Sequence, residues 1–345
     1  MSPHDALAEI AFRLERELAP GFKVKAFRRA AGVLDEFPAE EVEARLADGR
    51  LRRTKGIGDS TLLVVRQASE GAVPDYLQKL RDRADPGSGP GDVLEGLAAQ
   101  LRGDLHTHSE WSDGTTPIGA MVHAARLLGR DYLALTDHSP HLKIAHGLTP
   151  ERLAEQLDEV GALQKREESR PATERVHLLS GIEVDILDDG SLDQEPELLD
   201  RLDVVVASVH SKLRADRTTM TTRMLGAIEN PRTNILGHCT GRLVQGDRGT
   251  RPPSEFDAER VFAACAEHSV AVEINSRPER QDPPDDLIAL ALEAGCVFSI
   301  NSDAHAPGHQ GFLPLGAARA EAAGVPADRI LTTWPLERLQ EWLEG

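Results

Sequence analysis

The order of hydrophobic and polar positions divides the chain into two parts with different repeats. In the first part, apolar residues recur every three to four positions, and in the segment 6–18 they are Leu7, Ile10, Ala11, Leu14 and Leu18. This spacing places them on one face of a helix. The same period continues over residues 22–34 and 39–46, with no alternating strand pattern. We therefore expect residues 1–85 to form a small all-α domain.

A stretch rich in Pro and Gly follows the helical part. Pro86, Gly87, Gly89, Pro90 and Gly91 stand close together, and at this density neither a helix nor a strand can continue. We interpret residues 86–100 as a linker and lead-in, and residues 101–345 as a second, larger domain.

Beyond the linker, short apolar runs alternate with longer amphipathic segments. Seven runs have the composition of buried strands, at 103–108, 132–137, 177–185, 203–210, 234–238, 270–276 and 297–303. Segments with a helical period lie between most of them, at 118–128, 150–165, 218–229, 255–267 and 285–294. This alternation predicts an α/β fold with parallel strands, and seven repeats favour a closed (β/α) barrel related to the TIM barrel.

Charge is distributed as unevenly as hydrophobicity. The 345 residues carry a formal net charge of −18, yet residues 1–85 hold 15 basic and 15 acidic side chains, so the whole excess lies in residues 86–345. A strongly acidic body binds nucleic acid poorly unless a metal or a separate basic module neutralises it locally. The simpler alternative is that the charge only maintains solubility.

The cysteines and the lengths of the apolar runs indicate the cellular compartment in which we expect the protein. Cys239, Cys265 and Cys296 are odd in number and scattered, which argues against a disulfide framework. No apolar run reaches the roughly 18 residues that a membrane span needs, and the first residues do not resemble a secretory signal. We expect a cytoplasmic protein without membrane contact.

Each of the seven predicted strands ends in side chains that can bind a metal. Nine imidazole and carboxylate groups stand at or just after the strand ends: His106, His108, Asp113, His138, Glu183, His210, His238, Asp303 and His305. The carboxyl ends of barrel strands form one rim, so these groups should converge. Imidazole together with carboxylate suits Zn, Mn or Fe. Without a cation, so many buried charged and polar groups would be strongly destabilising.

The motifs that contain these groups resemble those of the PHP (polymerase and histidinol phosphatase) family over about residues 101–345. They are Asp-x-His-x-His at 104–108, Ser-Asp-Gly at 112–114, Thr-Asp-His at 136–138, Gly-Ile-Glu at 181–183, Ser-Val-His-Ser at 208–211, Gly-His at 237–238 and Ser-Asp-Ala-His at 302–305. The resemblance implies a distorted (β/α)7 barrel that hydrolyses phosphoesters at a trinuclear metal site.

The resemblance also implies how three divalent metal ions, Zn, Mn or Fe, would share the ligands. The first ion would have His106, His108, Glu183 and Asp303. The second would have Glu183 as a bridge, with His210 and His238. The third would have Asp113, His138 and His305.

Other polar residues near the strand ends have expected supporting roles. A metal-bound water would be the nucleophile, and we expect Asp104 and Asp137 to orient ligating imidazoles. The alternative for Asp137 is a strand-end hydrogen-bonding role. The nearest basic candidates for holding a substrate phosphate are Lys143, Lys212, Arg277 and Arg280.

The N-terminal part has a resemblance of its own. Residues 22–31 and the segment Lys55-Gly56-Ile57-Gly58 are similar to the N-terminal domain of X-family DNA polymerases, whose bacterial members also carry a PHP domain. Gly-Ile-Gly resembles a helix-hairpin-helix motif, in which backbone amides approach a phosphate, although a plain turn has the same composition. The candidate DNA contacts are Lys25, Arg28, Arg29, Lys55, Gly56 and Gly58.

Two departures from that polymerase group limit the expected activity. Only residues 85–101 separate the two similar regions, which leaves no room for a polymerase palm. The helix expected after the hairpin, 60–68, contains Arg66 but no lysine that could form a Schiff base. We therefore expect neither polymerase nor lyase activity.

Three hypotheses for function follow. The first is a metal-dependent DNA 3′–5′ exonuclease or 3′-end-processing enzyme, with residues 1–85 binding DNA. The second is a small-molecule phosphatase acting on a substrate such as histidinol phosphate. The third is a DNA-binding adaptor with an inactive barrel, which the complete ligand set disfavours.

Overall fold

The helical period before residue 85 corresponds to five α-helices in the computed structural model, which describes residues 1–84, 89–246 and 249–344. They are α1 (Pro3–Arg16), α2 (Gly21–Asp35), α3 (Ala39–Ala47), α4 (Asp59–Ser69) and α5 (Asp75–Arg83). They belong to the first of two compact units, Met1–Val93 and Leu94–Gly345. The prediction of a helical N-terminal region is confirmed. Part of the predicted linker, residues 86–88, lies outside the described residues.

The first helix begins at a capping residue, and one apolar core joins the helices of the first unit. The hydroxyl of Ser2 accepts a hydrogen bond from the Asp5 backbone N–H and caps α1. Leu7, Ile10 and Leu14 on the apolar face of α1 are buried in a cluster that also contains residues of α2, α4 and α5. The unit therefore has a core of its own.

The second unit is built on seven parallel strands in chain order. They are β1 (Gly103–Asp104), β2 (Tyr132–Leu135), β3 (His177–Asp185), β4 (Val204–Ser208), β5 (Ile235–Leu236), β6 (Ala271–Asn275) and β7 (Phe298–Asn301). Beyond the last ladder, Thr107 forms a parallel bridge with Ala304, and the His108 N–H donates to the Ala304 carbonyl over 2.8 Å. The predicted seven-stranded barrel is thus confirmed, nearly closed between its first and last strands.

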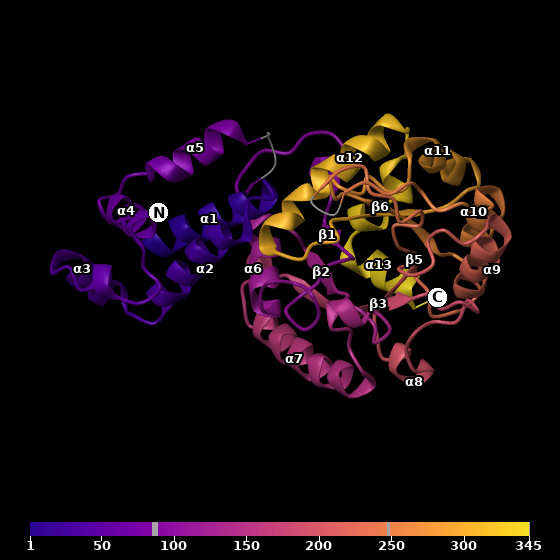
Figure 1. Ribbon diagram of the computed structural model, residues 1–345, viewed down its shortest axis with the longest axis horizontal. Helices are drawn as coiled ribbons and strands as arrows, with labels where there is room; N and C mark the ends of the chain where they lie inside the picture. Colours follow the sequence, from indigo (N-terminus) through magenta and orange to yellow (C-terminus); the bar gives the residue numbers. More distant parts are fainter. Residues whose placement is uncertain (85–88, 247–248, 345) are drawn as a thin grey trace. The chain divides into compact units, whose positions relative to one another are not determined.

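Helices surround the strands on the outside (Figure 1). They are α6 (Ile118–Leu127), α7 (Pro150–Glu168), α8 (Pro196–Leu199), α9 (Arg217–Ile228), α10 (Ala258–Glu267), α11 (Asp285–Glu293) and α12 (Leu313–Ala322), and α13 (Leu336–Leu343) closes the sequence of elements. Among the described residues, no helix is both long and apolar enough to span a bilayer.

Side-chain alternation along the strands separates two sets of buried residues. On β4, Val205 and Ala207 belong to the large cluster that includes α9 and α10, whereas Val204 and Val206 belong to a cluster with Leu331, Trp334 and Leu339 of the C-terminal segment. On the second face of β3, apolar Leu179 is followed by Glu183 and Asp185. Strand β3 therefore has an apolar beginning, packed on the C-terminal segment, and a polar end.

Several predicted strands are longer than the hydrogen-bonded ladders. Strand β1 ends at Asp104, whose Oδ1 accepts from the backbone N–H of His106 two residues later, over 3.3 Å. Past Asp104, the backbone N–H groups of Leu105 and Thr107 bind the side chains of Asn301 and Thr136. The potential ligands His106 and His108 thus lie just past the strand, on the rim.

The hydroxyl of Tyr132 joins the barrel to its C-terminal segment and gives a test of that packing. This fully buried hydroxyl lies 3.0 Å from the Leu331 carbonyl oxygen and 3.1 Å from that of Trp334. We predict that Tyr132→Phe lowers the free energy of unfolding by about 1–3 kcal/mol, because buried carbonyls lose their donor. Denaturant unfolding measures the change. Tyr76→Phe, at a partly exposed ring of the first unit, is the matched control and should stay near wild type; equal stability of both variants would contradict this role.

Candidate metal centre

Glu183 is the centre around which the imidazoles of the rim gather. Its Oε2 lies 2.9 Å from His138 Nδ1 and 3.4 Å from His106 Nε2. Its Oε1 lies 2.9 Å from His238 Nε2 and 3.3 Å from His210 Nε2. The carboxylate sits on β3 and is 1% exposed. A single buried carboxylate therefore faces imidazoles that follow four different strands.

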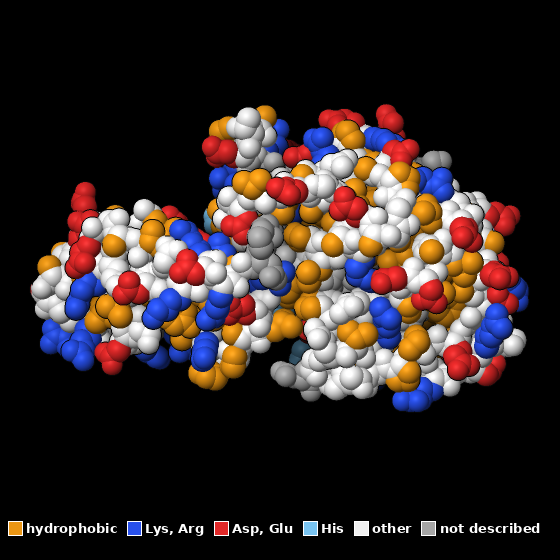
Figure 2. All heavy atoms as spheres, turned by 90° about the horizontal axis from the view of Figure 1, so that it is seen from above, with side chains coloured by type: hydrophobic (Ala, Val, Ile, Leu, Met, Phe, Trp, Pro, Cys, Tyr) orange, Lys and Arg blue, Asp and Glu red, His pale blue; other side chains and the backbone are white. Residues whose placement is uncertain are grey.

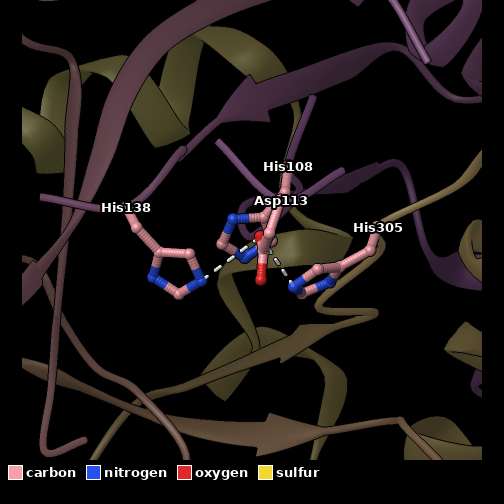
Figure 3. A group of neighbouring side chains, drawn as sticks. All are labelled: His108, Asp113, His138 and His305. Carbon is pink, nitrogen blue, oxygen red and sulfur yellow. Dashed lines mark ion pairs between the residues drawn. The ribbon is translucent and has the colours of Figure 1, made fainter. Parts of the chain in front are cut away.

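A second group lies at the more open side of the rim. Figure 3 shows His108, His138 and His305 turned toward Asp113. Asp113 Oδ1 lies 3.2 Å from His305 Nε2 and 3.5 Å from His138 Nε2. One ligand atom from each of these four residues lies within 4.8 Å of the other three. The loop that follows β1 thus supplies the carboxylate for this group, at the spacing metal binding requires.

Asp303 completes a third group with His106 and His108. Its Oδ1 lies 3.4 Å from His108 Nε2, and its Oδ2 accepts from Arg280 Nε over 3.0 Å. The backbone of Asp303 adopts a left-handed conformation with φ 51°, which is uncommon for a residue with a side chain and frequent at functional sites. This conformation aims the carboxylate into the rim just after β7.

Unsatisfied polar atoms are concentrated at this centre and test whether cations fit it. Among the described residues, both oxygens of Glu183 and the Nε2 atoms of His106, His108, His210 and His238 are buried without a hydrogen-bond partner. Such burial costs free energy unless another partner compensates. Divalent cations accept electron pairs from these N and O atoms. The residues present therefore fit divalent metal ions.

The pKa shifts of Glu183 and His108 match the protonation states of metal ligands. Burial by itself would raise the pKa of Glu183, but the imidazoles of His106, His210 and His138 hold it well below its usual range. Burial and the neighbouring imidazoles of His305 and His138 lower the pKa of His108 to about 3. Glu183 is thus ionised and His108 neutral near pH 7, which are the states that metal ligands require.

Two further carboxylates orient imidazoles, and the sequence did not identify them in this role. Glu273 on β6 accepts from or shares a proton with His106 Nδ1 at 2.7 Å, and Asp185 on β3 does the same with His210 Nδ1 at 2.6 Å. A carboxylate on Nδ1 directs Nε2 toward a metal. The only sequence signal was their place at strand ends, which Glu273 shares with the proposed ligands.

Asp104 and Asp137, expected to orient imidazoles, accept hydrogen bonds from other groups. Asp104 accepts from the Ser302 hydroxyl and backbone N–H and from the His106 backbone. Asp137 accepts from Ser109, Ser112 and Gln156. Burial raises the pKa of Asp104 to about 6. Both carboxylates bind hydroxyl and N–H groups of the rim segments.

Only one of the four basic candidates lines the pocket at the rim, as far as the described residues show. This pocket, of about 240 Å³, includes Asp113, His138, His210, His305, Asp303 and Arg280 in its lining. Arg277 is buried and donates to the Asp303 carbonyl and to Glu279. Lys212 pairs with Asp188 on the surface, and Lys143 is exposed on the overlying loop. Of the four candidates, Arg280 is therefore the one that lies at this pocket.

Comparisons with known proteins agree with this geometry. Residues 104–277 match the model of the PHP domain. The DNA polymerase/3′-5′ exonuclease PolX of Bacillus subtilis is 34% identical over 245 residues, which are 71% of this chain and 41% of that protein. The chain thus spans about two fifths of the length of that relative.

Two shorter proteins match over nearly their whole length. The probable phosphatase YcdX of Escherichia coli K12 is 28% identical over 256 residues, 70% of this chain and 94% of that protein. A histidinol phosphate phosphatase of Lactococcus lactis, solved with zinc, L-histidinol and phosphate, aligns with a TM-score of 0.48 at 17% identity, covering 65% of this chain and 92% of that one.

Replacement of Glu273 tests whether it positions a ligand. We predict that Glu273→Gln weakens metal binding by roughly 10- to 100-fold, because His106 loses its anionic partner at Nδ1. Competition with a chelator, followed by elemental analysis, measures the affinity. Asp203→Asn removes an exposed carboxylate that binds the hydroxyl and backbone N–H of Ser180 and should leave metal affinity unchanged. Equal affinity of both variants would show that Glu273 has no such role.

Proposed function

Because the chain belongs to the PHP domain family and is a metal-dependent phosphoesterase, we propose that it hydrolyses phosphodiesters at DNA 3′ ends, as a 3′–5′ exonuclease or 3′-end-processing enzyme. The observation that carries the catalytic part of this proposal is the set of unpartnered buried ligand atoms around Glu183. The DNA part rests on the helical unit that precedes the barrel and on the similarity to the Bacillus protein.

The proposed ligands divide among three divalent ions, with Zn, Mn and Fe as the candidates. One ion would lie among His106, His108, Asp303 and Glu183. A second would lie among Glu183, His210 and His238, and a third among Asp113, His138 and His305. The groups overlap, since His108 also faces the third set and His138 also faces Glu183. Shared ligands of this kind would keep the ions close enough to act on one phosphate.

Side chains of the pocket complement what the ions would supply. When bound, the cations would provide a deprotonated water and neutralise the phosphoryl oxygens. Arg280, anchored on Asp303 by its Nε, would present its remaining N–H groups to the phosphate. Leu142, Ile144 and Val209 line the same pocket and would limit the access of bulk water. The lining of the pocket thus combines charged side chains with apolar ones.

Several features support a phosphate-binding hairpin in the first unit. Gly56 has φ +101°, and a Cβ there would come within 2.9 Å of Val33 Cγ2, so the turn before α4 favours glycine. Gly58 is the N-cap of α4, and its N–H binds the Thr61 hydroxyl. Lys25, Arg29 and Lys55 are exposed. Arg28 is held by Glu15 in a two-pronged ion pair and is the weakest of the proposed DNA contacts.

The surface of the first unit agrees with a DNA-binding role. Figure 2 shows Lys and Arg side chains gathered along one edge of the helical unit, whereas on the visible face of the barrel basic and acidic side chains alternate. A basic edge can neutralise phosphates that the acidic barrel would repel. The two activities, binding and hydrolysis, would then belong to different units of the chain.

A small-molecule phosphatase is the second candidate. The Escherichia coli protein named as a probable phosphatase matches over 94% of its length. That match takes in 70% of this chain, and the match to the Bacillus protein takes in 71%. The third hypothesis, an inactive adaptor, is set aside because the chain is an enzyme of the PHP family.

Replacement of the central carboxylate tests the metal mechanism. We predict that Glu183→Gln lowers kcat/KM on a 3′-labelled oligonucleotide by at least about 100-fold, the size of effect that misplaced reacting groups produce. Release of nucleotides is followed with Mn²⁺, Zn²⁺ and Fe²⁺ in turn. Glu229→Gln, at an exposed position after α9, is the control. Hydrolysis of histidinol phosphate without any action on DNA ends would favour the second candidate instead.

Charge reversal in the hairpin tests the DNA contact. We predict that Lys55→Glu weakens binding to double-stranded DNA and lowers the slope of log K against log salt by about 1, because one phosphate contact is lost. Lys79→Glu makes the same charge change at an exposed residue of α5 that is not a proposed contact. Binding by fluorescence anisotropy at several salt concentrations separates the two. An equal loss for both variants would mean that only net charge matters.

A further inference from the structure

A second pocket adjoins the pocket at the rim. It has a volume of about 310 Å³, is formed by residues 213–216 after β4 and by Arg251, Pro252, Pro253 and Glu255 after β5, and we call it the outer pocket. Leu213 and Arg251 line both pockets. The two pockets therefore lie side by side.

Arg251 is fixed at the junction of the two pockets. Its Nε donates to the Gly241 carbonyl over 2.6 Å, and its backbone forms an antiparallel bridge with Leu243 through hydrogen bonds of 2.8 and 2.9 Å. The Ser254 hydroxyl donates to the Leu213 carbonyl over 2.8 Å and ties the two loops together. The guanidinium of Arg251 is thus held at the junction by residues of its own loop.

The walls of the outer pocket are apolar with polar edges. Leu213, Ala215, Pro252 and Pro253 provide flat hydrocarbon surface, and proline rings are rigid. Asp216 also lines the pocket, but its two carboxylate oxygens bind the N–H and hydroxyl of Thr219 at the start of α9. Arg214 and Glu255 remain as a donor and an acceptor at the edge.

A nucleoside has the chemistry that these walls match. Its base has apolar faces, with hydrogen-bond donors and acceptors at the edge, and its sugar links the base to the phosphoester at a fixed distance. Arginine side chains and apolar surfaces stack on the faces of such bases. A small polar phosphomonoester would occupy the rim pocket alone. We propose that the outer pocket binds the nucleoside next to the phosphate under attack, an inference that rests on the proposed phosphodiesterase function.

Two chromogenic phosphodiesters separate this inference from the function on which it rests. Thymidine 5′-(p-nitrophenyl phosphate) carries a nucleoside and methyl p-nitrophenyl phosphate does not, and both release p-nitrophenolate. The measured quantity is kcat/KM of the thymidine ester divided by kcat/KM of the methyl ester, with the full chain and Mn²⁺. We expect Ala215→Trp, which fills the outer pocket, to lower this ratio about tenfold, mainly by raising KM of the thymidine ester. Arg214→Ala should lower the ratio in the same direction.

The control is Ala263→Trp, at an exposed position on α10, which should keep the wild-type ratio. If both esters are hydrolysed and both outer-pocket variants keep that ratio within about twofold, the subsite is disproved while the phosphodiesterase function stands. If neither ester is hydrolysed by the wild-type protein with any of the candidate metals, the proposed function fails and the subsite with it.

Discussion

The constraint on which the barrel depends is the burial of many ligand atoms around one carboxylate. Glu183 is 1% exposed, and no hydrogen-bond donor among the described residues satisfies either of its oxygens. Cations would satisfy it, but only if the strands hold the surrounding imidazoles close together. The apolar half of the barrel provides that rigidity, because Leu179 on the same strand packs with Trp334 and Leu339 in a closed core. The apolar core at one end of the barrel therefore offsets the cost of burying ligand atoms without hydrogen-bond partners at the other end.

The position of Arg280 beside a proposed cation site is explained by its interaction with the Asp303 carboxylate. Its two oxygens face different partners, His108 on one side and Arg280 on the other. Burial would raise its pKa, but Arg280 above all holds it well below the usual range. Arg280 thus keeps the carboxylate ionised and oriented, while its free edge faces the pocket.

The sequence predicted those features that depend on pattern and order. Seven buried apolar runs became seven strands in chain order, and the polar residues after them met at one rim because parallel barrel strands end on the same side. It did not predict partners that only folding brings together. His106 and Glu273 are 167 positions apart, and Asp104 binds Ser302, which is 198 positions away. Lys212, another expected phosphate contact, pairs instead with Asp188, a surface contact that no periodicity encodes.

The division between strands and loops also bears on how substrate is chosen. Most proposed ligands lie within a few residues of a strand end, where the backbone is held by the ladder, so the chemistry of the centre is fixed by the barrel itself. Leu142, Ile144, Arg251 and Arg280, which line the pocket around the centre, come from loops. Loops can change in length and composition without disturbing the ladder. Specificity for a polymer or for a small ester would therefore be determined in the loops after β2, β4, β5 and β6, while the ligand set stays the same.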